Sequence, residues 1–162
     1  MRQWPADTAM LVLRIAVGLV FIPHGWSKVF GAHGVAGFAQ DLPSYHLPVF
    51  LGYAAAYSEL VGGFLLIGGL LTRVAAFFIA CTMAVATFIV QMPDALNDPD
   101  NIGKAKYFAV MHAIELPFAL LAAAVVLMLL GGGRWSLDGL VWNRVRVARG
   151  RTTRTATEPP PR

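Results

Sequence analysis

Charged residues are scarce in this sequence. Only 14% of its 162 residues are Asp, Glu, Lys or Arg, whereas 57% are hydrophobic, and the mean hydropathy is +0.60. Soluble domains carry about 25% charged and about 45–50% apolar residues. The apolar runs also lack the polar stripes at helical spacing that a soluble helical bundle needs on its outer faces. These absences argue against a soluble domain and favour an integral membrane protein.

Cysteine is almost absent as well. The single cysteine, Cys81, lies in the middle of an apolar run. A lone cysteine forms neither an internal disulfide nor a cysteine-based metal site. We therefore expect no thiol redox chemistry within this chain, and Cys81 is interpreted as a packing residue.

Hydrophobic residues gather instead in four long blocks. The blocks occupy residues 8–30, 47–71, 72–92 and 107–130. Each is close to or above the roughly 18–20 residues that cross about 30 Å of hydrocarbon as a helix. The first block is longer than the apolar region of a signal peptide and ends in His24, Trp26 and Lys28 rather than small residues, so we expect it to remain in the mature protein. The sequence predicts an all-α, polytopic four-helix membrane bundle within residues 1–142.

Basic residues indicate the orientation of this bundle. Arginines are concentrated after the fourth block, among them Arg134, Arg144, Arg146, Arg149, Arg151 and Arg154. Because Lys and Arg concentrate on the cytoplasmic side, both termini are predicted to be cytoplasmic and the protein to lie in the inner membrane. The net charge of +4 then faces the membrane surface, with no nucleic-acid partner. Residues 143–162 are too polar to fold alone and are predicted to form a basic, disordered cytoplasmic tail.

The connection at residues 31–46 is longer than most structureless loops. It contains several glycines and a small-residue stretch around 35–40 that is compatible with a short interfacial helix. A lid over the mouth of the bundle and a plain linker both remain open for this segment.

Seven ionisable residues lie inside or at the ends of the apolar blocks. They are Arg14, His24, Lys28, Glu59, Arg73, His112 and Glu115. A charge at the centre of a membrane helix costs roughly 2.5–3.5 kcal/mol on insertion scales, so several together are expected to face one another or water. Arg73 ends a block and is interpreted as an orientation charge. The other six are candidate site residues.

Helical phase places three of the candidates on one side of the first helix. At 100° per residue, Lys28 lies about 40° and His24 about 80° from Arg14. On the second helix, small residues cluster on the same face as Glu59. Small residues let helices approach closely, so Glu59 is expected at a packing surface rather than against lipid.

Depth adds a second carboxylate at the same level. Glu59 and Glu115 both fall roughly 12–18 Å below the predicted outer boundary, and His112 shares a helix face with Glu115 at i, i+3 spacing. Two carboxylates at this depth require a nearby cation. The sequence therefore predicts a central Arg14–Glu59 pair, with the two glutamates and the two histidines brought together between the helices.

Simpler interpretations stay open for each of these groups. Arg14 and Lys28 can extend to opposite membrane surfaces, a pair between Arg14 and Glu59 can be purely structural, and the histidines can be hydrogen-bonded core groups. A metal site built from the two histidines and two glutamates needs three helices to converge, so no metal is assigned.

Three groups of short motifs follow one another along the chain. They are LRI (13–15) through GLVF (18–21) to HGWSK (24–28), ELVGG (59–63) through LLIGGLLTR (65–73), and GGGRWSLD (131–138). In this order they resemble the DoxX-type membrane proteins (DoxX/DoxD-like), and the likeness covers nearly the whole chain except the basic tail. The resemblance implies a four-helix membrane bundle linked to redox metabolism. DoxD-type proteins are membrane subunits of a thiosulfate:quinone oxidoreductase, and some DoxX proteins form complexes with soluble partners that handle thiols or superoxide.

The resulting hypothesis is an inner-membrane subunit of a redox system that holds a quinone-like ligand between its helices. The chain has no flavin, haem or cysteine-pair motif, so no covalently held cofactor is implied and a soluble or membrane redox partner would supply electrons. Glu59, Glu115 and His112 are the predicted proton-exchanging, catalytic groups. Arg14, His24 and Lys28 are the predicted ligand-binding groups.

Two functions of other classes are kept as alternatives. A small proton-coupled transporter would use Glu59 or Glu115 as its binding carboxylate. The polar residues of the first block have no counterparts in the third block, which counts against the inverted repeats of many transporters. A non-catalytic scaffold would use the basic tail and inner loops to dock soluble redox enzymes.

Overall fold

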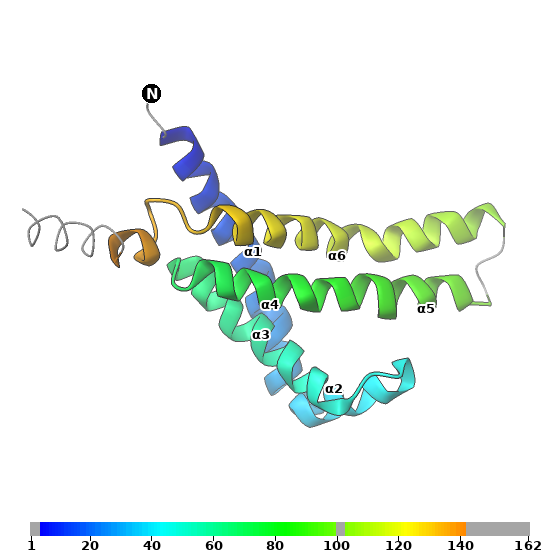
Figure 1. Ribbon diagram of the computed structural model, residues 1–162. Helices are drawn as coiled ribbons and strands as arrows, with labels where there is room; N and C mark the ends of the chain where they lie inside the picture. The colour runs from blue at the N-terminus through cyan, green and yellow to red at the C-terminus, as the bar shows by residue number, and fades with distance from the viewer. Residues whose placement is uncertain (1–3, 100–102, 142–162) are drawn as a thin grey trace, which may run out of the picture.

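The computed structural model describes residues 4–99 and 103–141 (Figure 1). Every regular element within these residues is helical, which confirms the all-α prediction. Four stretches are long and apolar enough to cross a membrane, as predicted. The orientation of the termini remains a prediction, and the predicted tail at 143–162 lies outside the described residues.

The four membrane-spanning segments differ from the predicted blocks mainly at their ends. They are α1 (Trp4–Phe30), α3 (Val49–Gly68), the continuous run of α4 (Thr72–Val85), η2 (Ala86–Gln91) and α5 (Met92–Asn97), and α6 (Lys104–Leu130). The third span passes the predicted end at residue 92 because the helix continues through Pro93 to the end of α5 at Asn97. The second span ends before Gly69, three residues earlier than predicted.

Gly69 ends α3 because its backbone is left-handed, with φ +65°. The N–H of Gly69 donates to the carbonyl of Leu66 at 3.1 Å, and the N–H of Leu70 donates to Leu65 at 3.0 Å, which is a common way to close a helix. The carboxylate of Asp138 then accepts the N–H groups of Leu71 and Thr72, each at 2.8 Å, at the start of α4.

The helices pack as two pairs, α1 with α3 and α4 with α6, and α3 also contacts α4. Figure 1 shows α4 and α6 side by side while α1 and α3 cross them obliquely. Small residues allow these close contacts: a Cβ on Gly25 would overlap the backbone of Leu60, and a Cβ on Gly18 would lie 2.7 Å from the carbonyl of Gly63.

The connection between α1 and α3 contains α2 (Gly34–Asp41) and η1 (Leu42–Tyr45), so the small-residue stretch around 35–40 is helical, as its composition allows. Ala39 of α2 is fully buried against Gly52 of α3. The hydroxyl of Tyr45 donates to the carboxylate of Asp94 at 2.8 Å and so joins η1 to α5. This hydrogen bond to a carboxylate, followed by burial, raises the pKa of Tyr45.

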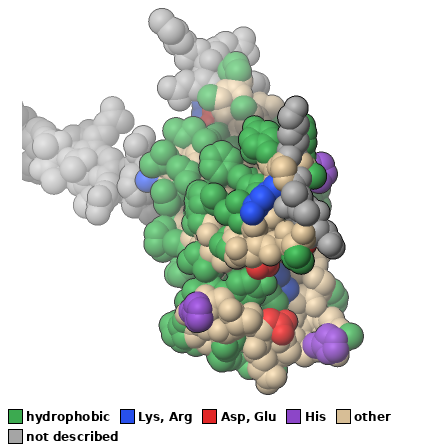
Figure 2. Space-filling view, turned by 90° about the vertical axis from the view of Figure 1, so that its right-hand side faces the viewer, with side chains coloured by type: hydrophobic (Ala, Val, Ile, Leu, Met, Phe, Trp, Pro, Cys, Tyr) green, Lys and Arg blue, Asp and Glu red, His purple; other side chains and the backbone are tan. Residues whose placement is uncertain are grey.

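The outer surface suits a lipid environment. Many large hydrophobic side chains are exposed, among them Leu19, Phe64 and Phe88. Figure 2 shows that hydrophobic side chains cover broad areas of one face, with ionisable side chains scattered singly among them. The surface carries the apolar side chains that a membrane would cover.

Candidate functional site

The central feature of the site is an ion pair between Lys28 of α1 and Glu59 of α3. The Lys28 ammonium lies 2.6 Å from Oε1 and 2.7 Å from Oε2 of Glu59, so it donates to both carboxylate oxygens. The Glu59 side chain is 1% exposed and that of Lys28 is 25% exposed. Gly25 packs directly on Leu60. Lys28 lies one turn after Gly25, and Glu59 directly precedes Leu60, so this contact brings the ammonium within reach of the carboxylate. A charge-assisted, two-oxygen contact of this kind compensates the cost of burying Glu59.

The short helix α2 also contacts the cation of this ion pair. The Lys28 ammonium lies 4.7 Å from the centroid of the Phe38 ring. A cation over an aromatic face is attracted by the ring quadrupole, and the attraction grows as water is removed. Phe38 therefore helps to hold the ammonium against Glu59 and away from solvent.

A cavity of about 550 Å³ lies on one side of the ion pair. Its walls come from α2, η1, α3, α4 and η2 and are largely apolar, with Phe38, Phe77 and Phe78 among them. A few polar groups converge on it, including the Lys28–Glu59 pair and the Ser58 and Thr82 hydroxyls, which lie 3.0 Å apart. Small-molecule sites typically have volumes of about 300–1,000 Å³, apolar walls and a few placed polar groups.

A smaller cavity of about 120 Å³ adjoins the same ion pair. Lys28, Glu59 and Gln91 line both cavities, whereas His24 and Pro117 line only the smaller one. This volume admits a few water molecules, and polar groups are present to bind them. The ion pair is therefore the polar boundary between a ligand-sized space and a water-sized space.

The π-helix η2 (Ala86–Gln91) contributes Ala86 and Gln91 to both cavities. Single π-turns inside α-helices are rare and frequently occur at functional sites. Nothing in the sequence pattern marked residues 86–91 as different from the rest of the third block, so sequence reasoning missed both η2 and Gln91. The hydroxyl of Thr87 donates to the Met83 carbonyl at 2.7 Å within this segment.

The predicted Arg14–Glu59 pair is wrong. Arg14 is fully buried, but its Nη2 donates to the backbone carbonyl of Trp135 at 2.7 Å, at the opposite end of α1 from Lys28. Fourteen residues separate Arg14 from Lys28, which is about 21 Å along a helix. Since Glu59 packs at the level of Gly25, only Lys28 reaches it.

The predicted convergence of two glutamates and two histidines is also wrong. His24 and Glu59 share the smaller cavity, but the side chains of His112 and Glu115 are 87% and 61% exposed. They pair with each other, His112 Nδ1 to Glu115 Oε1 at 3.5 Å, as their spacing on one helix face predicted. Glu115 lies about 160° around α6 from the buried Pro117, so the packing of α6 turns this pair outward.

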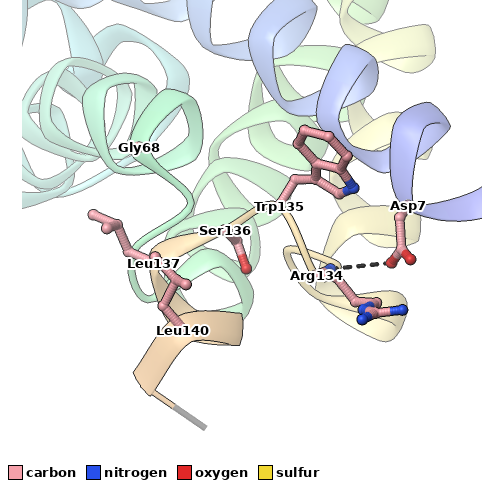
Figure 3. Close-up of a pocket in the computed structure, with 7 residues that line it drawn as sticks. All are labelled: Asp7, Gly68, Arg134, Trp135, Ser136, Leu137 and Leu140. Atoms are coloured by element: carbon pink, nitrogen blue, oxygen red, sulfur yellow. Dashed lines mark hydrogen bonds between the residues drawn. The ribbon is translucent and has the colours of Figure 1, made fainter. Parts of the chain in front are cut away.

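A second polar region lies at the other end of the bundle, where the segment after α6 returns to α1. A crevice of about 490 Å³ lies there, lined by Asp7 of α1 and by Arg134, Trp135 and Ser136 among others. Figure 3 shows the lining residues. The backbone N–H of Arg134 donates to Asp7 Oδ1 at 3.0 Å. Together with Arg14 and Asp138, this contact fastens residues 131–140 to the bundle.

Arg73 belongs to the same end of the molecule. Its side chain is exposed and its Nη2 donates to the carbonyl of Leu129 at 3.2 Å, in the last turn of α6. A cation at a helix C-terminus interacts favourably with the helix dipole. Among the described residues, no group of three or more His, Cys, Asp or Glu side chains is arranged to hold a metal ion.

Sequence comparisons with known proteins identify a family and several bacterial relatives. Residues 9–92 match the model of the DoxX family, a range that contains every residue lining the larger cavity. A Bacillus subtilis (strain 168) protein named "Putative oxidoreductase CatD" is 33% identical over 84% of this chain and 89% of its own length. An uncharacterized membrane protein of Mycobacterium tuberculosis is 28% identical over 84% and 86% of the two chains. The inner membrane protein YqjF of Escherichia coli (strain K12) is 28% identical over 83% and 93%.

No solved structure matches this chain. The family match covers all of α3 and α4 and nearly all of α1. The four apolar helices independently indicate a membrane protein. The chain is a multi-pass membrane protein and belongs to the DoxX family.

Proposed function

We propose that this protein is the membrane subunit of a redox system and that it binds a quinone-like ligand in the larger cavity, beside the Lys28–Glu59 pair. The observation that carries the proposal is the position of this pair, buried at the junction of a ligand-sized and a water-sized cavity. The name of the Bacillus subtilis relative supports a redox role. The name of the Escherichia coli relative supports a place in the inner membrane.

The cavity offers complementary surfaces to a flat, weakly polar ring. Phe77 and Phe78 provide aromatic walls for stacking. The Lys28 ammonium and the side chain of Gln91 provide donors for ring carbonyl oxygens. This division between apolar walls and a few donors is what orients a ligand with two carbonyl groups and an apolar body.

The ion pair also provides a route for protons. Reduction of a quinone to a quinol consumes two electrons and two protons, and in the membrane the protons must reach oxygens that bulk water does not touch. Glu59 lies on the boundary between the two cavities, and His24 lines the smaller one. Glu59 passes protons from the water-sized cavity to the ligand, His24 exchanges them with that cavity, and Lys28 holds Glu59 in place. Electrons come from a soluble or membrane-bound partner oxidoreductase.

Cys81 gives a direct test because it is the single cysteine of the chain, is exposed and lines the larger cavity. The alkylation rate of Cys81 by N-ethylmaleimide is measured in detergent with increasing decyl-ubiquinone. A bound ligand competes with the reagent, so the rate is expected to fall roughly tenfold at ten times the Kd. An unchanged rate at every ligand concentration, with Cys81 still reactive, would disprove the proposed site.

Two alanine variants make the test specific. Ala55 lines the cavity and Ala36 is exposed on α2 outside it. We expect Ala55→Phe to fill the space and abolish protection of Cys81 by decyl-ubiquinone, and Ala36→Phe to leave protection intact. Equal protection in both variants would mean that the ligand acts elsewhere on the protein.

One observation favours a second candidate, a small proton-coupled transporter. The Lys28–Glu59 pair separates two cavities, as a closed gate would. A transporter requires solute uptake into proteoliposomes that depends on a proton gradient and disappears in Glu59→Gln. The redox function requires no such uptake, so the two candidates differ in this measurement.

A further inference from the structure

His112 and Glu115 form an ionisable pair that faces outward from α6. Their side chains are 87% and 61% exposed, and within the described part of the chain the recorded polar contact of each is with the other, at 3.5 Å. Glu115 lies two residues from the middle of the 27-residue helix α6, roughly 3 Å along its axis. A carboxylate facing lipid at that depth is costly and rare. A protein surface that covers the pair removes this cost.

The exposed pair is part of a longer stripe on α6. Exposed residues recur at alternating steps of four and three: Phe108, His112, Glu115, Ala119, Ala122 and Val126. This 3.5-residue spacing is the seam of left-handed helix pairs. The stripe lies about 180° from the buried Ala124 at Glu115, and Figure 1 shows α6 at an edge of the bundle with α4 on its other side.

We infer that this α6 stripe binds a second copy of the same chain, with the two α6 helices parallel. Copies inserted in the same orientation are related by a two-fold axis along the membrane normal, so each residue of the stripe meets the same region of its mate. Ala119 and Ala122, near the centre of the stripe, let the two backbones approach closely.

Charge complementarity selects a second copy as the occupant. In a parallel pair, each stripe side chain packs into a hole formed by residues of the facing helix at its own level and one turn away. One turn separates His112 from Glu115, so the imidazole of each chain contacts Glu115 of the other as well as its own counterpart. The contact within one chain uses His112 Nδ1 and Glu115 Oε1, so Nε2 and Oε2 can bind a second copy. Lipid tails offer no hydrogen-bonding group to this pair, whereas a second α6 offers a donor and an acceptor at the required depth.

Disulfide crosslinking in native membranes tests this interface. In a Cys81→Ser background, Ala122→Cys and Ala119→Cys place a thiol on the stripe, and Ala123→Cys is the matched control because Ala123 packs against the core of its own chain. Oxidation with copper phenanthroline is expected to convert the stripe variants to covalent dimers containing this polypeptide alone, at least about tenfold more than Ala123→Cys. Equal yields at all three positions, or a crosslink to a different polypeptide, would overturn the inference.

The ionisable pair is tested separately from the packing. Glu115→Leu, added to Ala122→Cys, is expected to lower the yield of covalent dimer about tenfold because it leaves His112 without its acceptor on either chain. Glu115→Gln keeps a hydrogen-bond acceptor and is expected to retain most of the yield. Monodisperse elution and unchanged circular dichroism show that each variant is folded. An undiminished dimer yield in folded Glu115→Leu would overturn the role of the His112–Glu115 contact in the dimer.

Discussion

Glu59 and Glu115 occupy similar depths in apolar helices and have opposite surroundings. Glu59 is 1% exposed and holds the Lys28 ammonium with both oxygens. Glu115 is 61% exposed and lies 3.5 Å from a histidine of its own helix. The cation of Glu59 therefore comes from another helix, whereas the partner of Glu115 comes from the preceding turn of its own helix. A pair across helices joins two elements, but a pair along one helix adds nothing to the packing of the monomer.

Small residues account for this difference. Gly62 and Gly63 follow Glu59 on α3, and Gly25 on α1 packs against Leu60, so two backbones meet at the level of the carboxylate. On α6 the small residues nearest to Glu115 on its own face are Ala119 and Ala122, and both are exposed. Among the described residues, the buried carboxylate is the one at which glycines bring a second helix close enough to supply a cation.

Removal of each carboxylate should separate the two cases most strongly. Glu59→Leu leaves the partly buried Lys28 ammonium without its anion, and breaking such a pair is expected to cost about 3 kcal/mol of stability. Glu115→Leu, measured at a protein-to-detergent ratio that keeps the chain monomeric, should change stability by less than about 0.5 kcal/mol. Thermal unfolding in mild detergent, followed by tryptophan fluorescence, measures both.

The double variant Lys28→Met/Glu59→Leu controls for loss of packing. Because it removes both charges, it should recover most of the stability lost in Glu59→Leu. A double variant as unstable as Glu59→Leu would mean that shape at this position, rather than charge, sets the stability. Equal losses in Glu59→Leu and Glu115→Leu would break the comparison itself.

The glycine contact provides the next largest test. A Cβ on Gly25 would overlap the backbone of Leu60, so Gly25→Ala should separate α1 from α3 and cost about 2 kcal/mol. The matched control is Gly68→Ala, because a Cβ on Gly68 would meet its nearest neighbour, a Leu137 methyl carbon, at an ordinary 3.8 Å. Alanine in place of a helical glycine is neutral or stabilising by up to about 1 kcal/mol.

Access to the larger cavity provides a further measurement that should differ between Gly25→Ala and Gly68→Ala. If the glycine contact positions the ion pair, Gly25→Ala should also speed alkylation of Cys81 as the cavity loosens, and Gly68→Ala should not. Identical unfolding temperatures for the two alanine variants would show that the close approach of α1 and α3 is unnecessary for burying Glu59.

Part of the contrast between Glu59 and Glu115 could be predicted from the sequence. The four spans follow from the length and composition of apolar runs, which are local properties. Small residues on the face of Glu59 correctly predicted a packing surface there, and helical phase correctly placed His24 and Lys28 on one side of α1. These inferences need only one helix at a time.

The remaining features depend on how two helices are placed relative to each other. Whether Arg14 or Lys28 meets Glu59 is decided by where α1 crosses α3, and that crossing is fixed by the contact of Gly25 with Leu60. The outward direction of His112 and Glu115 was equally hidden, because a helix that is hydrophobic all round gives no sign of which face is buried. The sequence of residues 86–91 resembles the rest of the third span, so the π-turn there could not be predicted from it.

An exposed tether at the edge of the cavity gives the smallest expected effect. Tyr45, which lines the same cavity as Glu59, donates to Asp94 at 2.8 Å, and Tyr45→Phe should cost less than about 1 kcal/mol because the contact is exposed. The hydrogen bond raises the pKa of Tyr45 above its usual value of about 10. A group with a raised folded pKa contributes its stability below the unfolded pKa and loses it as pH rises through the folded value.

The unfolding temperatures of the wild type and Tyr45→Phe should therefore differ at pH 7 and converge above about pH 10. Comparing the two proteins at each pH cancels the effects of the ionisable groups that both contain. A difference that persists unchanged at high pH would assign it to lost packing of the hydroxyl rather than to the Tyr45–Asp94 hydrogen bond. If Tyr45→Phe loses far less stability than Glu59→Leu, and loses it in a pH-dependent way, then a polar contact buried between helices stabilises this chain more than an exposed one does.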